Sequence, residues 1–136
     1  SNFIFLGQVK NDSQLVMANG NAFSSVSILN KALEICNSKE KEMIYRFHPR
    51  EYNIKAVIEV LSWCRKHNVP ISNRGNLEDL SNTYPGFVTF NSTAGLQLIS
   101  KSKDVYCIDP KCFYKNWTKF ELDYFISKIL LPVADF

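Results

Sequence analysis

The chain has 136 residues, of which 46% are hydrophobic and 21% are charged, and it carries a net charge of +3 at pH 7. This length and composition are typical of one folded domain and exclude a disordered chain. The small positive charge suits an anionic ligand but is far below that of a nucleic-acid-binding domain. We therefore expect a single domain over residues 1–136 with no nucleic acid partner.

The four cysteines and two histidines do not form a metal-binding pattern, because no C-x-x-C pair is present. Cys36, Cys64 and Cys107 lie in apolar segments, where a free thiol behaves as a small hydrophobic side chain. Free thiols persist in reducing compartments, and no apolar run reaches the length that spans a membrane. The sequence thus predicts a cytoplasmic protein without a metal ion.

Short apolar runs alternate with segments of helical periodicity along the whole chain. In chain order we predict a strand at 3–8, a helix at 22–37, strands at 43–47 and 69–72 separated by a helix at 54–64, a short helix at 77–84, a strand at 86–90, a helix at 93–100, a strand at 104–108 and a helix at 120–130. Strict alternation predicts a Rossmann-like α/β fold with helices on both faces of a doubly wound parallel sheet. We expect three α/β/α layers and five strands in the order 3-2-1-4-5.

The most informative segment is 87–99, where an apolar strand passes through Asn91, Ser92 and Thr93 into a helix. The first backbone N–H groups of a helix lack intrahelical partners, and the helix dipole is positive there, so a phosphate fits. The same three residue types also make an ordinary N-cap without any ligand. Both interpretations stay open on this segment alone.

The predicted strand order brings the polar loops of the chain to one edge of the sheet. In doubly wound sheets, ligands bind beyond the carboxyl ends of the strands, where the strand order reverses. Here the reversal lies between the first and fourth strands, so the loops after Gln8 and Phe90 face each other, with the loop around His48 beside them. The side chains expected to converge are Gln8, Lys10, Asp12, Ser13, Arg46, His48, Arg50, Asn91, Ser92 and Thr93.

Within this group His48 is the candidate catalytic residue, because an imidazole can donate a hydrogen bond to a phosphate or to a leaving-group oxygen. Arg46 or Arg50 can balance the charge of the anion. His48 can equally serve only to fix its own loop, and Asp12 is of a type that often forms turns. The chain has no Gly-rich phosphate loop, which argues against NAD and ATP as ligands.

Four ordered segments carry a family resemblance: GQVKNDS at 7–13, RFHP at 46–49, NSTAG at 91–95 and FYKNW at 113–117. With these segments the chain resembles bacterial capsule polysaccharide biosynthesis proteins that transfer Kdo, a 3-deoxy-octulosonic acid, from CMP-Kdo. The resemblance implies that the domain is the C-terminal, donor-binding half of a two-domain GT-B glycosyltransferase. The His-Pro and Ser-Thr pairs also resemble those of bacterial sialyltransferases, which use CMP-sialic acid.

The resemblance implies that His48 and Pro49 contact cytidine monophosphate (CMP) and that Ser92 and Thr93 bind its phosphate. An aromatic segment at 113–117 would form a wall near the sugar, although it can equally be a packed loop. The converging loops and the resemblance together give the expected donor-binding residues: Gln8, Lys10, Asp12, Ser13, Arg46, His48, Pro49, Arg50, Asn91, Ser92, Thr93, Gly95 and Tyr114.

The resemblance also implies the setting of the whole enzyme. The CMP-sugar is a donor substrate, no cofactor is needed, and a glycan or glycolipid acceptor is bound with help from an N-terminal GT-B domain. The full protein would act in capsule or lipopolysaccharide assembly in the bacterial cytoplasm, with peripheral association at the inner face of the inner membrane. The alternative from another class is a non-catalytic, flavodoxin-like interaction module.

Overall fold

The computed structural model describes residues 1–9 and 25–134, and it gives the surroundings of side chains as far as Ile129. The predicted site residues Lys10, Asp12 and Ser13 lie outside the described residues. The same holds for most of the polar loop that the sequence places after the first strand.

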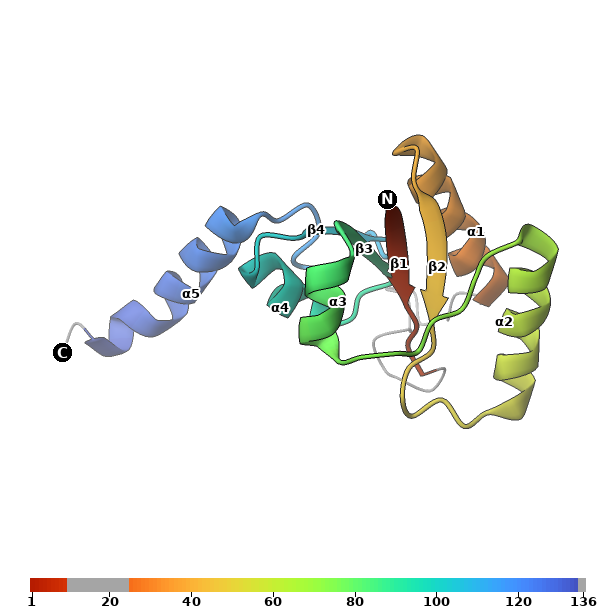
Figure 1. Ribbon diagram of the computed structural model, residues 1–136. Helices are drawn as coiled ribbons and strands as arrows, with labels where there is room; N and C mark the ends of the chain where they lie inside the picture. Colours follow the sequence, from red (N-terminus) through yellow and green to blue (C-terminus); the bar gives the residue numbers. More distant parts are fainter. Residues whose placement is uncertain (10–24, 135–136) are drawn as a thin grey trace.

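A parallel sheet of four strands forms the centre of the molecule, in the order β2-β1-β3-β4 (Figure 1). The strands are β1 (Asn2–Leu6), β2 (Glu42–Arg46), β3 (Gly86–Thr89) and β4 (Asp104–Cys107). Because all the strands are parallel, their carboxyl ends lie at the same edge of the sheet. The reversal of strand order falls between β1 and β3.

The prediction of five strands in the order 3-2-1-4-5 is wrong in its count, because residues 69–72 form no strand. They make one isolated parallel bridge, between Tyr45 and Ile71. Two hydrogen bonds hold it, from Tyr45 N to Pro70 O at 2.9 Å and from Ser72 N to Tyr45 O at 2.9 Å. Just after β2, Phe47 N donates to the side-chain Oδ1 of Asn73 at 3.0 Å instead of to a backbone carbonyl. This bond ends the pairing between β2 and residues 69–72.

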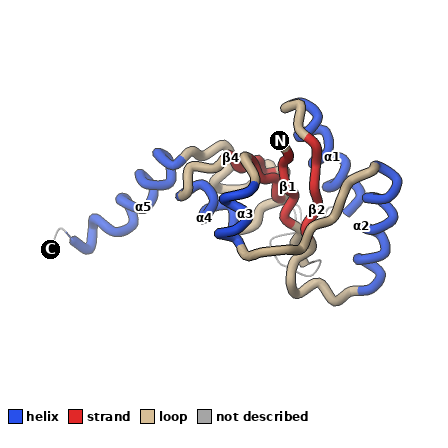
Figure 2. The backbone as a smooth tube through the Cα atoms, viewed as in Figure 1, coloured by secondary structure: helices blue, strands red, loops and turns tan. Residues whose placement is uncertain are grey.

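The described part of the chain contains five helices, of which the first four cover the sheet (Figures 1 and 2): α1 (Ser25–Ser38), α2 (Ile54–His67), α3 (Leu77–Thr83), α4 (Ala94–Ser100) and α5 (Lys119–Ala134). The helices α1 and α2 pack on one face, and α3 and α4 on the other. The last helix starts beside α4 and projects away from the sheet. None of the helices in the described part of the chain is long and apolar enough to cross a membrane.

Two apolar clusters fill the spaces between these three layers, and β1 contributes to both. Its side chains alternate, so Phe3 and Phe5 pack toward α1 and α2, whereas Ile4 and Leu6 pack toward the other helices. A strand buried on both faces is continuously apolar, as this one is. The expected α/β/α layering follows from this double burial.

Local capping fixes where the helices around the site begin and end. Asn53 Oδ1 accepts from Ala56 N at 3.0 Å at the start of α2, and Asn68 ends that helix in the left-handed region with a φ of 56°. At the start of α3, Asn76 and Asp79 form a reciprocal capping box. These caps set the path of the loops that lie between β2 and α3.

The packing of β1 against β3 predicts that Gly86→Ala destabilises the fold. A Cβ on Gly86 would lie 2.4 Å from Cε1 of Phe3, its partner in the sheet register, and both residues are buried. Overpacking of this kind costs about 1–3 kcal/mol, which exceeds the gain of about 0.4–1 kcal/mol from removing a glycine. Urea unfolding measures the difference. The exposed Glu59→Ala control should stay within about 0.5 kcal/mol of wild type, and equal stabilities for the two variants would contradict the packing.

Candidate functional site

Three polar side chains join the carboxyl ends of β1, β3 and β4. Gln8 Nε2 donates to Asn91 Oδ1 at 3.0 Å, and Asn91 N donates back to Gln8 Oε1 at 3.0 Å. On its other side, Asn91 Nδ2 donates to Asp109 Oδ2 at 2.9 Å. Asn91 and Asp109 are buried, so these bonds are shielded from competing water. The predicted facing of the loops after Gln8 and Phe90 is therefore present as direct contact.

The turn between β3 and α4 is held by hydrogen bonds within the chain. Ser92 N donates to Thr89 Oγ1 at 3.1 Å, and the hydroxyl of Ser92 accepts from Ala94 N at 3.2 Å. Ser92 O accepts from Gly95 N at 3.0 Å and from the hydroxyl of Tyr114. Thr93 is exposed and its side chain makes no capping bond. Most N–H groups of this turn are thus already used, and Ser92 and Ala94 are the residues of the turn that line the cavity described next.

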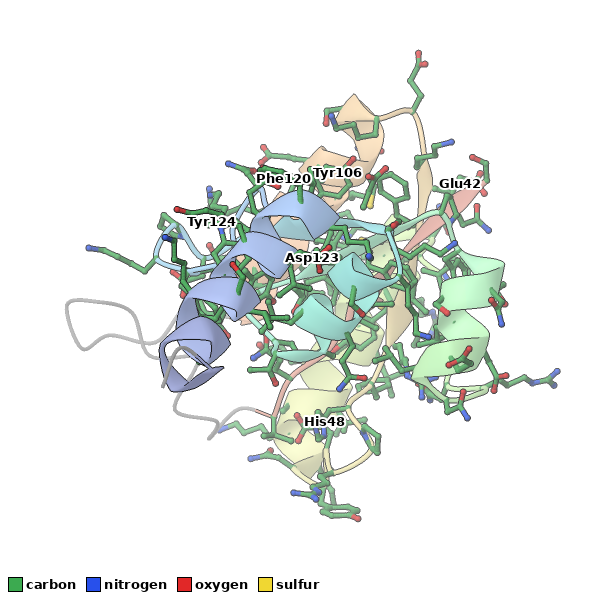
Figure 3. The ribbon with its side chains drawn as sticks, turned by 90° about the vertical axis from the view of Figure 1, so that its left-hand side faces the viewer. Glu42, His48, Tyr106, Phe120, Asp123 and Tyr124 are labelled. Carbon is green, nitrogen blue, oxygen red and sulfur yellow. The ribbon has the colours of Figure 1, made fainter. Side chains whose placement is uncertain are left out.

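A cavity of about 430 Å³ lies between the ends of β1 and β2, the loop before α3 and the start of α4. It brings Arg46, His48 and Pro49 together with Ser92, four of the residues expected from the sequence. Figure 3 shows His48 at the opposite end of the molecule from Glu42, the first residue of β2. The lining residues are Leu6, Gly7, Arg46, Phe47, His48, Pro49, Gly75, Asn76, Leu77, Leu80, Ser92 and Ala94.

The imidazole of His48 is oriented by its own loop. Its Nδ1 accepts a hydrogen bond from Arg50 N at 3.0 Å, while His48 O accepts from Glu51 N at 3.0 Å. In a neutral imidazole, an acceptor at Nδ1 places the proton on Nε2. His48 is half-buried in the cavity wall, so its Nε2–H is the donor available to a bound ligand.

Arg46 organises the opposite wall of the cavity. Its guanidinium donates to Arg74 O at 2.9 Å and to Gly75 O at 2.7 Å. Gly75 has a φ of 80°, a conformation that favours glycine, so the loop turns sharply where Arg46 binds its carbonyl groups. Neither ion pair found among the described residues involves Arg46. Its positive charge therefore favours an anion in the cavity.

The other predicted residues support the site or lie beside it. Arg50 is exposed and contributes its backbone N–H rather than its guanidinium to His48. Gly95 is buried where a Cβ would lie 2.6 Å from the Tyr114 hydroxyl oxygen. Tyr114 has only 1% of its surface exposed, so it packs behind α4 and not in the cavity wall. In the described part of the chain, no cluster of three His, Cys, Asp or Glu side chains could hold a metal ion.

Asp109 is the site residue that the sequence analysis missed. Its Oδ2 accepts from Asn91, and its Oδ1 accepts from Lys111 N at 2.9 Å, so both carboxylate oxygens are engaged. The signal was present, because Asp109 directly follows an apolar strand whose end shares the edge with Gln8 and Asn91. An Asp followed by Pro is, however, also typical of an ordinary turn.

The model of one protein family, described as capsule polysaccharide biosynthesis protein, matches residues 1–117 of the chain. Its match contains all the residues of the cavity and the chain of bonds from Gln8 to Asp109. No curated protein and no solved structure matches the sequence.

The tautomer of His48 is a direct prediction of its loop geometry. At neutral pH, ¹⁵N spectra should show the neutral imidazole of His48 protonated at Nε2, because Arg50 N–H occupies Nδ1. Arg50→Ala keeps that N–H and should keep the tautomer, whereas Arg50→Pro removes the donor and should give a mixture. A wild-type imidazole protonated at Nδ1 would contradict the assignment of Nε2–H as the donor available to a ligand.

The Asp109 carboxylate is expected to stabilise the fold as well as the site. Asp109→Ala removes the acceptor of Asn91 Nδ2 and of Lys111 N, and it should lower the free energy of unfolding by about 1.5–3 kcal/mol, as for a bond to a charged group. Chemical denaturation provides the measurement. Asp104→Ala is the matched control, because Asp104 is an exposed carboxylate at the start of β4, the strand that Asp109 follows. A loss no greater than that of the control would show that the buried network contributes nothing.

Proposed function

The chain belongs to the family of capsule polysaccharide biosynthesis proteins, and from this membership we propose that it is the donor-nucleotide domain of a glycosyltransferase. The family connects the chain with capsule synthesis and with a glycosyltransferase-related role. The proposal goes further and assigns a CMP-sugar, CMP-Kdo, as the donor whose nucleotide occupies the cavity beside His48. A CMP-sugar is a substrate, so the proposed reaction uses no separate cofactor.

One observation carries the proposal: the His48-Pro49 pair and Ser92, far apart in the sequence, line one cavity at the point where the strand order reverses. Ligands of doubly wound sheets bind at this point. A volume of about 430 Å³ falls in the range of small-molecule sites. The cavity offers an imidazole N–H, a hydroxyl and a guanidinium charge, which together suit a phosphate monoester.

The proposed chemistry is stabilisation of the departing CMP. Transfer breaks the bond between the sugar and a phosphate oxygen, so negative charge grows on that phosphate. His48 Nε2–H would donate to the phosphate, and the charge of Arg46 would favour the developing anion. Donors held in place before the reaction stabilise such charge without reorganising. His48 is therefore the proposed catalytic residue, and the backbone of Arg50 positions it.

We place the glycan or glycolipid acceptor outside the described cavity. In the proposed enzyme, a preceding Rossmann-like domain of GT-B type binds the acceptor and supplies the group that activates it. The described domain alone is then expected to bind the donor nucleotide but to transfer sugar poorly. The proposed setting is the cytoplasmic face of the bacterial inner membrane, where capsule or lipopolysaccharide precursors are assembled.

Calorimetric titration with CMP tests the proposal, with UMP and UDP as controls. Binding should be selective for CMP, and His48→Ala should weaken it by about ten- to hundredfold, as expected when one hydrogen bond to a charged group is lost. His67→Ala is the matched control, because His67 lies on α2 and stacks on Trp63 with ring centroids 4.4 Å apart. That variant should bind CMP as wild type does.

Two outcomes would change the assignment. If CMP causes no response at millimolar concentration, or if His48→Ala binds as tightly as wild type, the donor-binding role fails and a non-catalytic interaction module is the better account. If the full-length enzyme transfers from CMP-sialic acid but not from CMP-Kdo, the nucleotide stands and the sugar is corrected.

A further inference from the structure

Two thiols lie against each other behind the candidate site. Cys107 is the last residue of β4 and is buried, while Cys112 is half-buried in the following turn. A hydrogen bond from Cys112 N to Asp109 O, at 3.1 Å, folds the turn back and brings the two sulfur atoms to 3.4 Å. A disulfide needs about 2.05 Å between its sulfurs, so the two thiols lie in contact and must approach further to be joined.

The four cysteines differ in their chemistry. The contact between the two sulfur atoms lowers the pKa of Cys112, because a thiolate at Cys112 can accept from the Cys107 thiol, while the same contact and burial raise the pKa of Cys107. Burial raises the pKa of Cys36 and of Cys64 to about 11. Since the thiolate is the nucleophile, Cys112 is the cysteine expected to react first.

We propose that Cys107 and Cys112 form a reversible disulfide by exchange with a small-molecule disulfide such as oxidised glutathione. The Cys112 thiolate attacks one sulfur of the oxidant, forms a mixed disulfide and releases one glutathione thiolate. The sulfur of Cys107 then attacks Cys112 and releases the second glutathione. Two electrons pass from the protein to the oxidant, and the two thiol protons end on the two released glutathione molecules.

The pair is connected to the candidate site through Tyr114. The hydroxyl of Tyr114 interacts with both thiols and donates to Ser92 O, and it packs closely against Gly95 at the start of α4. Joining the sulfurs removes both thiol protons and moves the segment that carries Tyr114. Because Ser92 lines the cavity, oxidation of Cys107 and Cys112 is expected to change the cavity wall. In a reducing compartment such a pair acts as a sensor and not as a structural bridge.

Peptide mapping of the full chain tests the disulfide itself. Trypsin cleaves after Lys103, Lys111 and Lys115, so it separates Cys107 in peptide 104–111 from Cys112 in peptide 112–115. After treatment with oxidised glutathione and acid quenching, a digest without reductant should contain these two peptides joined, with two hydrogen atoms lost. Cys36 and Cys64 should remain thiols, which makes them internal controls.

Two variants test the order of the steps. Cys107→Ser should trap glutathione on Cys112, because no second thiol resolves the mixed disulfide, and Cys112→Ser should leave residue 107 unmodified. The proposal is overturned if the wild-type peptides are not joined, if Cys36 or Cys64 is oxidised first, or if Cys107 is glutathionylated in Cys112→Ser. The wild-type map decides the matter even if a variant does not fold.

The link to the cavity has two readouts. Oxidation should shift the backbone amide resonances of Ser92 and Gly95 in wild type but not in Cys112→Ser, and unchanged resonances would overturn the link. The second readout rests on the proposed function: oxidation should weaken CMP binding about fivefold, as for one lost hydrogen bond, and reductant should restore it. If the reduced chain does not bind CMP, the proposed donor-binding role is wrong. The peptide map and the amide resonances still test the Cys107–Cys112 disulfide and its effect on Ser92.

Discussion

The paired hydrogen bonds between Gln8 and Asn91 are the constraint on which the site depends. They tie the end of β1 to the end of β3 at the reversal of strand order, which is the place where ligands of doubly wound sheets bind. Asp109 completes the connection from β4, and burial makes these bonds costly to break. These bonds hold the ends of β1, β3 and β4 in register. They therefore fix the position of the turn that carries Ser92 relative to the loop after β2.

Some side chains around the cavity fix its wall, and other groups are available to a ligand. Arg46 donates hydrogen bonds to the backbone before α3, and the Tyr114 hydroxyl donates to the Ser92 carbonyl. His48 is fixed through Nδ1 by a backbone N–H, which leaves Nε2–H as the ring donor that a ligand in the cavity can use. A site prepared in this way can stabilise charge that develops on a bound phosphate, since its donors need not reorganise.

Periodicity alone was sufficient for the four strands and for the layers formed by the first four helices, because both faces of β1 are buried. It also predicted the last helix, but the apolar face expected there is not buried, since Phe120, Tyr124 and Ile129 are exposed. The prediction of a fifth strand was wrong because Phe47 N bonds to the side chain of Asn73, and no sequence pattern reveals that bond. The convergence of His48 and Ser92 followed from topology. The inward packing of Tyr114 and the part played by Asp109 did not, because both depend on how one turn folds behind α4.

The most direct test of the account is a crystal structure of the chain with CMP. The account predicts that the nucleotide occupies the cavity between the end of β2 and the start of α4, with its phosphate within hydrogen-bonding distance of His48 Nε2 and the Ser92 hydroxyl. The bonds between Gln8, Asn91 and Asp109 should be unchanged from the free chain. A nucleotide bound elsewhere, or a phosphate that faces away from His48, would contradict it.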